Sequence, residues 1–139
     1  MILKPFEIED LDRINFSVEY NELESKEQAI ELFDTMNDES IFATFVDDGK
    51  VVAISGIKHI HGDVGEAFNI RTENLEARHI KEIKKNLHEA AKMFDRVHTV
   101  SNPKWDRWHE ALGFEKEATM RKFMHGEDYN LWVIINEGG

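Results

Sequence analysis

The chain has 139 residues, of which 41% are hydrophobic and only 2 are proline. This length and composition predict one folded domain spanning residues 1–139 and exclude an intrinsically disordered chain. The absence of cysteine excludes a disulfide framework and thiolate chemistry, so we expect a cytoplasmic protein. The opening residues become acidic too early for a signal peptide, and no apolar run is long enough to span a membrane.

Charge is distributed unevenly. The net charge is −11, and the first 50 residues carry 14 Asp and Glu against 4 Lys and Arg. This negative charge repels nucleic acid and anionic membranes, so we expect no nucleic-acid partner and no membrane partner. It favours a basic protein partner or an amine substrate. An acidic surface that only keeps the protein in solution is an equally good interpretation.

The first third of the chain predicts one strand followed by two helices. Residues 1–7 form a short strand, which Pro5 places at a sheet edge. The acidic run 9–12 favours a helix start, with Leu11, Ile14 and Val18 on one face. A second helix is expected over 24–34, with Ser25 as its N-cap.

The middle third predicts a meander of three strands. Residues 41–46 and 51–57 alternate as hairpin strands, and Asp48-Gly49 supplies the positive backbone angles of a tight turn. A second turn is expected within 59–64, because His59, His61, Gly62 and Asp63 follow one another closely. It leads into an antiparallel strand over 64–71.

The last part of the chain begins with the clearest helix, over 75–94, where apolar residues recur every three or four positions. A strand over 96–100, a helix over 104–112 ending at Gly113, and a hairpin of strands 116–124 and 129–135 complete the chain. We therefore expect an α/β (α+β) fold with a mixed, mostly antiparallel central sheet of six to seven strands flanked by about four helices.

The segment Asn102-Pro-Lys-Trp-Asp-Arg-Trp-His-Glu-Ala-Leu-Gly-Phe114 is the most informative stretch. It resembles the Asn-x-x-Ala-x-x-x-Tyr-x-x-x-Gly-Phe pattern of the GCN5-related N-acetyltransferase (GNAT) superfamily. Asn102 matches the Asn and Gly113-Phe114 the final pair, whereas Trp105 stands at the small residue and His109 at the tyrosine. The predicted order of strands and helices is similar to the GNAT fold over essentially the whole chain.

The resemblance implies acetyl-CoA as cosubstrate, bound where the fourth and fifth strands part. The backbone of Phe68, Asn69, Ile70 and Arg71 would pair with the pantetheine arm, and Asn102 would orient the coenzyme. Asn102 also suits the N-cap of a helix opened by Pro103. In the superfamily a glycine-rich loop then holds the pyrophosphate on free amides at a helix start.

The corresponding loop here, residues 72–78, departs from that signature. It contains no glycine, and Glu73 and Glu76 stand where anions should bind. Arg71, Arg78 and His79 could hold phosphates instead by side-chain charge. The alternative is that these side chains only form the solvated face of a helix.

The resemblance also implies catalytic residues. His109 would replace the tyrosine that protonates the departing thiolate, or be an ordinary, partly exposed helix residue. Glu66 is the best-placed carboxylate to deprotonate the amine, with His59 and His61 as rivals. His59-x-His61 has no third ligand at a diagnostic spacing, so we predict no metal site. The three tryptophans, Trp105, Trp108 and Trp132, could line a pocket or fill a helix–sheet seam.

Two functions follow. The first is an N-acetyltransferase that moves acetyl from acetyl-CoA to a small-molecule or peptide amine by direct attack. In the superfamily the last strand often mediates pairing, which would make the chain a homodimer. The second is a catalytically inactive, partner-binding protein. It rests on a looser resemblance to GNAT-like internal virion or assembly proteins of short-tailed bacteriophages, which would place the chain in the host cytoplasm or the virion.

Overall fold

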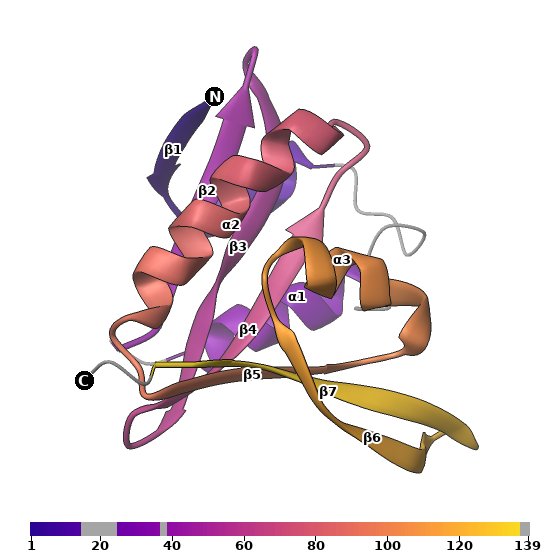
Figure 1. Cartoon of the computed structure of the whole chain (residues 1–139). Helices are drawn as coiled ribbons and strands as arrows, with labels where there is room; N and C mark the ends of the chain where they lie inside the picture. Colours follow the sequence, from indigo (N-terminus) through magenta and orange to yellow (C-terminus); the bar gives the residue numbers. More distant parts are fainter. Residues whose placement is uncertain (15–24, 37–38, 137–139) are drawn as a thin grey trace.

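The computed structural model describes residues 1–14, 25–36 and 39–136. They form a seven-stranded sheet in the order β1-β2-β3-β4-β5-β7-β6 (Figure 1). The strands are β1 (Ile2–Pro5), β2 (Ile41–Asp47), β3 (Lys50–His61), β4 (Val64–Arg71), β5 (Arg96–Ser101), β6 (Glu115–Met124) and β7 (Glu127–Ile135). The helices are η1 (Ile8–Arg13), α1 (Lys26–Asp34), α2 (Ala77–Ala91), η2 (Pro103–Trp105) and α3 (Asp106–Ala111), of which η1 and η2 are 3₁₀.

The sheet consists of two antiparallel halves. Strands β1 to β4 form the first half, and β5, β7 and β6 form the second. The halves meet at β4 and β5, which are parallel and joined by the crossover helix α2. Asp48 and Gly49 turn the β2–β3 hairpin with φ of 51° and 73°, as the Asp-Gly pair predicts.

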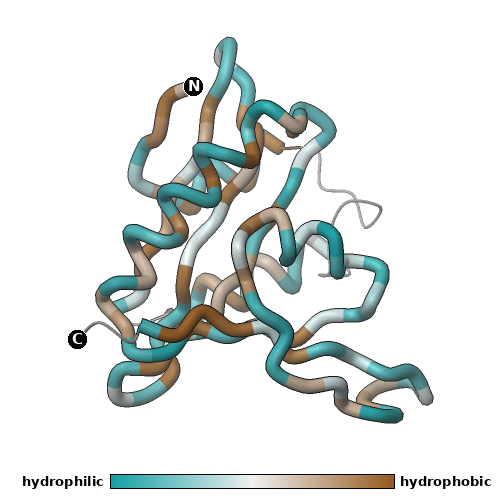
Figure 2. Tube along the Cα trace, viewed as in Figure 1, coloured by the Kyte–Doolittle hydropathy of each residue, from teal (hydrophilic) through white to brown (hydrophobic). Residues whose placement is uncertain are grey.

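Each half of the core lies on one face of the sheet. Helix α2 crosses the near face in Figure 1, and α1 lies behind the sheet. The larger buried cluster joins α2 to its face through Ile83 and Leu87 of the helix and Phe94 of the turn that follows it. The smaller one joins η1 and α1 to the opposite face through Leu11, Ala29 and Ile70. The hydrophobic end of β7 is the brown stretch next to the C-terminus in Figure 2.

The structure confirms the predicted fold class and most elements, with small differences. Ser25 caps α1 by accepting a hydrogen bond from the Gln28 amide at 3.2 Å. The helix expected from residue 9 is a single 3₁₀ segment, Ile8–Arg13, and Val18 lies outside the described residues. The helix expected over 104–112 is split into η2 and α3. Among the described residues, no helix is both long and apolar enough to cross a membrane.

Candidate functional site

Strands β4 and β5 part soon after they meet. Their parallel pairing covers only three positions, the last of which joins Glu66 to His98. Beyond it β4 continues to Arg71 while β5 continues along β7 to Ser101. The β5-facing edge of β4 beyond Glu66 therefore has no strand partner among the described residues, and it can pair with an extended ligand.

A cavity of about 190 Å³ fills the space between the parted strands. Four elements line it. Strand β4 supplies Glu66 to Asn69, β5 supplies Thr99 and Val100, α1 supplies Leu32 and α3 supplies His109. The structure thus brings together four of the residues singled out in the sequence, namely Glu66, Phe68, Asn69 and His109.

The side chain of Asn69, which lines this cavity, has an unsatisfied polar atom. Its side-chain Oδ1 is buried and has no hydrogen-bond partner in the described part of the chain. A buried acceptor without a partner costs free energy, about 1–3 kcal/mol. Such an atom is satisfied when a ligand with an N–H or O–H group enters. Glu66 is exposed and lies at the same wall.

His109 is buried rather than partly exposed, with 2% of its surface accessible. Its Nδ1 lies 3.0 Å from the Trp105 carbonyl oxygen and 3.2 Å from Ser101 Oγ. Because a carbonyl only accepts, Nδ1 carries the proton. Burial lowers the pKa of His109 to about 4, since the charge of Arg71 adds to desolvation and outweighs the hydrogen bond to Trp105. The ring is therefore neutral at pH 7.

Asn102 acts as a cap. Its Oδ1 accepts a hydrogen bond from the Lys104 amide at 3.0 Å, and its Nδ2 donates to Glu127 Oε2 at 2.8 Å. Both polar atoms of the side chain thus have partners within the chain. Of the two interpretations left open by the sequence, the structure shows the capping one, and a contact with coenzyme stays a prediction.

Arg71 crosses the gap between the two halves of the sheet. It is the last residue of β4, is only 5% exposed, and directs its guanidinium toward η2 and α3. The Cζ atom lies 4.1 Å from the Trp105 ring centroid and 4.6 Å from that of Trp108. Both distances are within the range of cation–π attraction. We call these three residues the Arg71 bridge.

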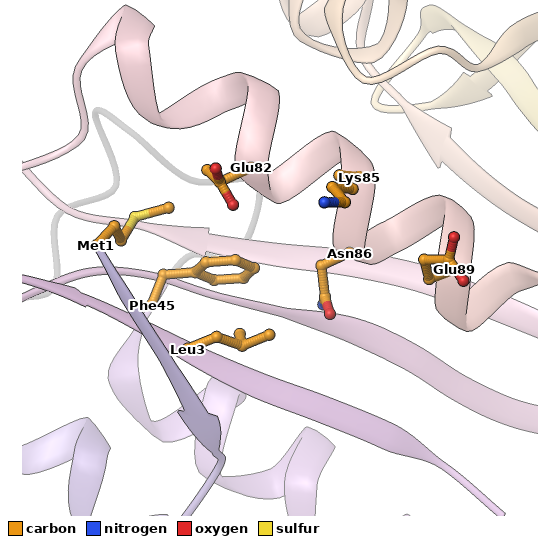
Figure 3. A pocket seen from close by; sticks show the side chains of 7 residues that line it. All are labelled: Met1, Leu3, Phe45, Glu82, Lys85, Asn86 and Glu89. Atoms are coloured by element: carbon orange, nitrogen blue, oxygen red, sulfur yellow. The ribbon is translucent and has the colours of Figure 1, made fainter.

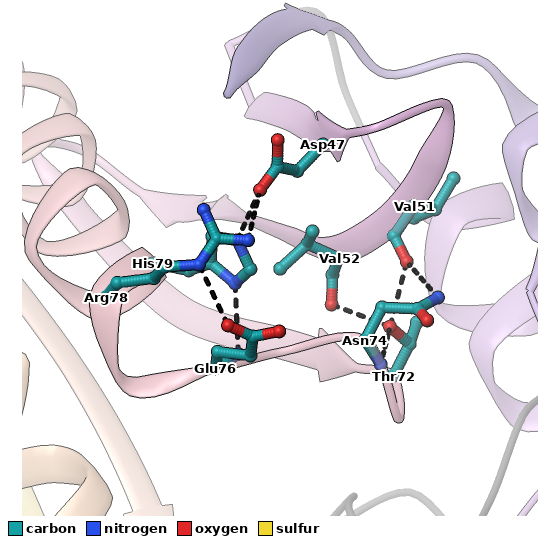
Figure 4. Close-up of polar contacts among 8 residues, drawn as sticks. All are labelled: Asp47, Val51, Val52, Thr72, Asn74, Glu76, Arg78 and His79. Atoms are coloured by element: carbon teal, nitrogen blue, oxygen red, sulfur yellow. Dashed lines mark hydrogen bonds and ion pairs between the residues drawn. The ribbon is translucent and has the colours of Figure 1, made fainter.

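Hydrogen bonds hold the loop after β4 against the start of β3 (Figure 4). Thr72 Oγ1 lies 2.8 and 2.9 Å from the carbonyl oxygens of Val51 and Val52, and Asn74 Nδ2 donates to Val51 at 3.2 Å. Backbone amides are occupied as well: those of Thr72, Asn74, Leu75, Glu76 and His79 each donate to an acceptor within the chain. These amides are not free to hold a pyrophosphate.

Arg78 and His79 extend from the start of α2 toward the β2–β3 hairpin (Figure 4). His79 is buried; its Nδ1 accepts the Glu76 amide at 2.9 Å and its Nε2 donates to Asp47 Oδ2 at 2.8 Å. Arg78 lies 2.8 Å from both Asp47 and Glu76. The hydrogen bond from His79 and the charge of Arg78 lower the pKa of Asp47. Both side chains therefore bind Asp47.

The rival histidines lie elsewhere. His59 Nε2 is 3.0 Å from Glu39 Oε2 and lines a hollow beside Gly62 and Phe94, and neither it nor His61 lines the cavity between β4 and β5. A further hollow lies between β1 and α2, where Leu3 and Phe45 face Glu82 and Glu89 (Figure 3). No cluster of three potential metal ligands occurs within the described ranges.

Two features of the site were not predicted from the sequence. One is the Arg71 bridge, which joins residues more than thirty positions apart. The other is Asp47, which organises the start of α2 from a distant hairpin. Trp105 in place of a small residue was the only signal of the first, and the acidic Asp47-Asp48 turn gave no sign of the second.

Comparison with solved structures identifies the fold. A spermidine N-acetyltransferase chimera from Vibrio cholerae and hSSAT superposes with a TM-score of 0.74 at 15% identity, covering 96% of this chain and 94% of that one. A ribosomal-protein-S5-alanine acetyltransferase from Vibrio fischeri gives 0.70 at 17% identity, covering 98% and 93%. A GNAT-family acetyltransferase from Streptococcus pneumoniae gives 0.70 at 14%, covering 96% and 98%.

The chain therefore has the fold of the GNAT acetyltransferases. No protein-family model matches the sequence, and neither does any curated protein. Identities of 14–17% establish the fold alone. They leave the looser resemblance to phage virion proteins as a hypothesis.

Proposed function

We propose that the protein is an N-acetyltransferase that transfers acetyl from acetyl-CoA to an amine. One observation carries the proposal. Strands β4 and β5 part after Glu66 and His98, and the cavity between them is lined from both strands and from α3. An opening at this point in an otherwise continuous sheet gives an extended ligand a backbone edge on one side and side chains on the other.

The residues fit one end of the coenzyme better than the other. The unpaired edge of β4 over Phe68 to Arg71 suits the amides of a pantetheine arm, and the Asn69 Oδ1 atom would accept a hydrogen bond there. The loop over 72–76 suits the pyrophosphate poorly, because the amides of Thr72, Asn74, Leu75 and Glu76 already have partners. Side-chain charge from Arg71 would have to serve instead.

When bound, acetyl-CoA supplies an acetyl thioester, and the chain's own residues manage protons around it. Glu66, exposed at the wall of the cavity, would take a proton from the incoming ammonium directly or through water. His109 would donate a proton to the leaving sulfur. Since its pKa is about 4 and the neutral ring holds its one proton on Nδ1 at the Trp105 carbonyl, His109 would first take a proton from solvent on Nε2. The negative charge that develops on the sulfur favours this by raising the pKa of His109.

An amine that is cationic in water fits the charge of the chain. The first 50 residues, which carry 14 of the 28 acidic residues, include α1, which contributes Leu32 to the cavity. Two of the structural neighbours are named for a polyamine and for the alanine of a ribosomal protein. We propose a cationic amine as the acceptor, either a small molecule or a peptide terminus.

A second function is favoured by two observations. The Arg71 bridge spans the gap through which a coenzyme would leave the cavity toward α2. The loop before α2 is closed by its own hydrogen bonds. Both features suit a protein that keeps the GNAT fold without using coenzyme and binds a basic partner through its acidic surface.

A thermal-shift titration with acetyl-CoA separates the two functions. Binding at one hundred times the dissociation constant would stabilise the fold by about 2.7 kcal/mol, whereas a protein without coenzyme use shows no shift at any concentration. If a shift is seen, acetylation of spermidine and of alanine-terminated peptides, followed by thiol release, tests the transferase. A bound coenzyme without turnover on any cationic amine would contradict the proposed acceptor class.

A further inference from the structure

We propose that the Arg71 bridge is a latch that closes the coenzyme end of the cleft in the free protein and opens when coenzyme binds. The inference rests on the proposed function, because it concerns access to the same cleft. It assigns Trp105 and Trp108 a positioning role toward Arg71, rather than contact with the reacting atoms.

The position of Arg71 on β4 is the first argument. Side chains alternate along a strand, so Ala67, Asn69 and Arg71 share one face. The first two line the cavity between the parted strands. Arg71 is the last of the three and immediately precedes the loop that leads to α2. A linear ligand running from the cavity to the start of α2 along this edge must therefore pass Arg71.

The contacts of Arg71 are the second argument. Its guanidinium reaches across to Trp105 of η2 and Trp108 of α3, at 4.1 and 4.6 Å from the two ring centroids. Both rings lie in the helical segment that follows β5 in the chain. The two strands that part at Glu66 and His98 are thus joined again at the far end of the gap, by side chains instead of backbone hydrogen bonds.

The charge of the latch is the third argument. Arg71 lies close enough to His109 to help lower its pKa. The charge of the bridge therefore acts on a residue that lines the cavity. A guanidinium held on aromatic rings is also the group best suited to grip phosphate oxygens with two parallel hydrogen bonds. In the latch, the guanidinium contacts the indole rings in the closed form and exchanges these contacts for an anion in the open form.

A latch of this kind has a measurable consequence. When only a fraction of the molecules is open, the apparent dissociation constant is raised by the reciprocal of that fraction. Removing the Trp105 ring deletes one of the two cation–π contacts of the closed form and keeps the Arg71 side chain. If the Trp105 contact shifts the closed–open equilibrium about tenfold, which corresponds to ~1.4 kcal/mol, Trp105→Ala tightens coenzyme binding by up to about tenfold.

Isothermal titration of the whole chain with coenzyme A tests this. Trp105→Ala should lower the dissociation constant, and Trp105→Phe, which keeps a weaker aromatic face, should lower it less. Phe123→Ala removes an exposed ring at the tip of the β6–β7 hairpin and serves as the matched control with unchanged binding. Should the alanine variant fail to fold, the phenylalanine variant carries the test alone.

A second measurement does not depend on affinity. The Arg71 Nε–H proton, assigned by its loss in Arg71→Lys, should show an upfield ring-current shift in the free protein and return toward its ordinary position when coenzyme A saturates the site. A shift that persists in the complex would show that the bridge stays closed, and the latch would be refuted.

The outcomes for the latch and for the transferase differ. If wild type and Trp105→Ala bind coenzyme equally well, or the variant binds more weakly, the transferase stands and the latch is wrong. If neither binds, the transferase loses its donor, and the bridge is not what limits access. Binding that appears or tightens only in the ring-deleted variants supports both.

Discussion

The Nδ1 atom of His109 lies 3.0 Å from the backbone carbonyl oxygen of Trp105, one helical turn earlier in the chain. The ring stacks on Trp132 at 5.7 Å and meets Phe114 edge-on at 5.6 Å. Aromatic neighbours on both sides exclude water, and this burial accounts for most of the lowered pKa. The histidine at the superfamily's tyrosine position is therefore part of the core as well as of the cavity wall.

A pH dependence of stability follows. The pKa of His109 is about 4 in the folded chain against an ordinary 6.5, so between these values the unfolded state binds the proton and the folded state does not. Folding stability therefore falls as pH drops from 6.5 toward 4, by about 3 kcal/mol from this residue. Urea unfolding at pH 7.5 and 4.5 measures the loss.

The control for this dependence is His109→Gln, which cannot titrate and should lose less stability over the same range. Burial also lowers the pKa of His98, so His98→Asn is needed to separate the two contributions. Equal pH dependence in wild type and His109→Gln would show that the His109 pKa is not depressed in solution.

A buried carboxylate ties the N-terminal strand to the sheet. Asp10, 3% exposed, accepts hydrogen bonds from Lys4 at 2.9 Å, from the Glu7 amide at 3.0 Å and from Thr44 at 2.7 Å. Burial raises its pKa, but the hydrogen bonds outweigh burial and the net pKa is lowered. Asp10→Asn should destabilise the fold by about 1–3 kcal/mol, measured by denaturant unfolding; exposed Glu9→Gln is the control, expected within about 0.5 kcal/mol.

The elements could be predicted because their signals are local. The bounds of β4, 64–71, agree with the prediction, because the Gly62-Asp63 turn precedes the strand and the loop over 72–76 follows it. The Asp48-Gly49 turn and the Ser25 cap depend on single residues with strong backbone or hydrogen-bonding preferences. The split of the 104–112 helix depends on Pro103 and on packing, which periodicity does not report.

The site was predictable only in part because its geometry is not local. The cleft residues Glu66, Asn69 and His109 could be named from their place in the fold, but the burial of His109 could not. Arg78 and His79 could be named as candidate phosphate-binding residues near the loop, yet their partner, Asp47, is about thirty residues away. Long-range pairing of charges is not encoded in the spacing of either segment.

The loop before α2 yields a prediction about charge. Glu73 is exposed in the loop that would lie near the coenzyme's phosphates under the proposed function, where its carboxylate would oppose them. Glu73→Lys should tighten coenzyme A binding by about two- to fivefold at low salt, with the gain shrinking as salt rises. The same charge change at exposed Glu27 of α1 should leave binding nearly unchanged; equal effects at both positions would mean that the loop does not face the phosphates.

Glu66 yields the sharpest test of the proposed chemistry. It lies at the last pairing position of β4 with β5 and lines the cavity, where the incoming ammonium would lose a proton in the proposed reaction. Glu66→Gln keeps the size of the side chain but cannot accept that proton, so kcat should fall by about 10²-fold or more while the affinity for coenzyme stays within about twofold. The pH profile should lose its acidic limb in the variant. Glu110→Gln, an exposed change on α3, is the matched control, and an unchanged kcat in Glu66→Gln would assign deprotonation of the amine to another group or to water.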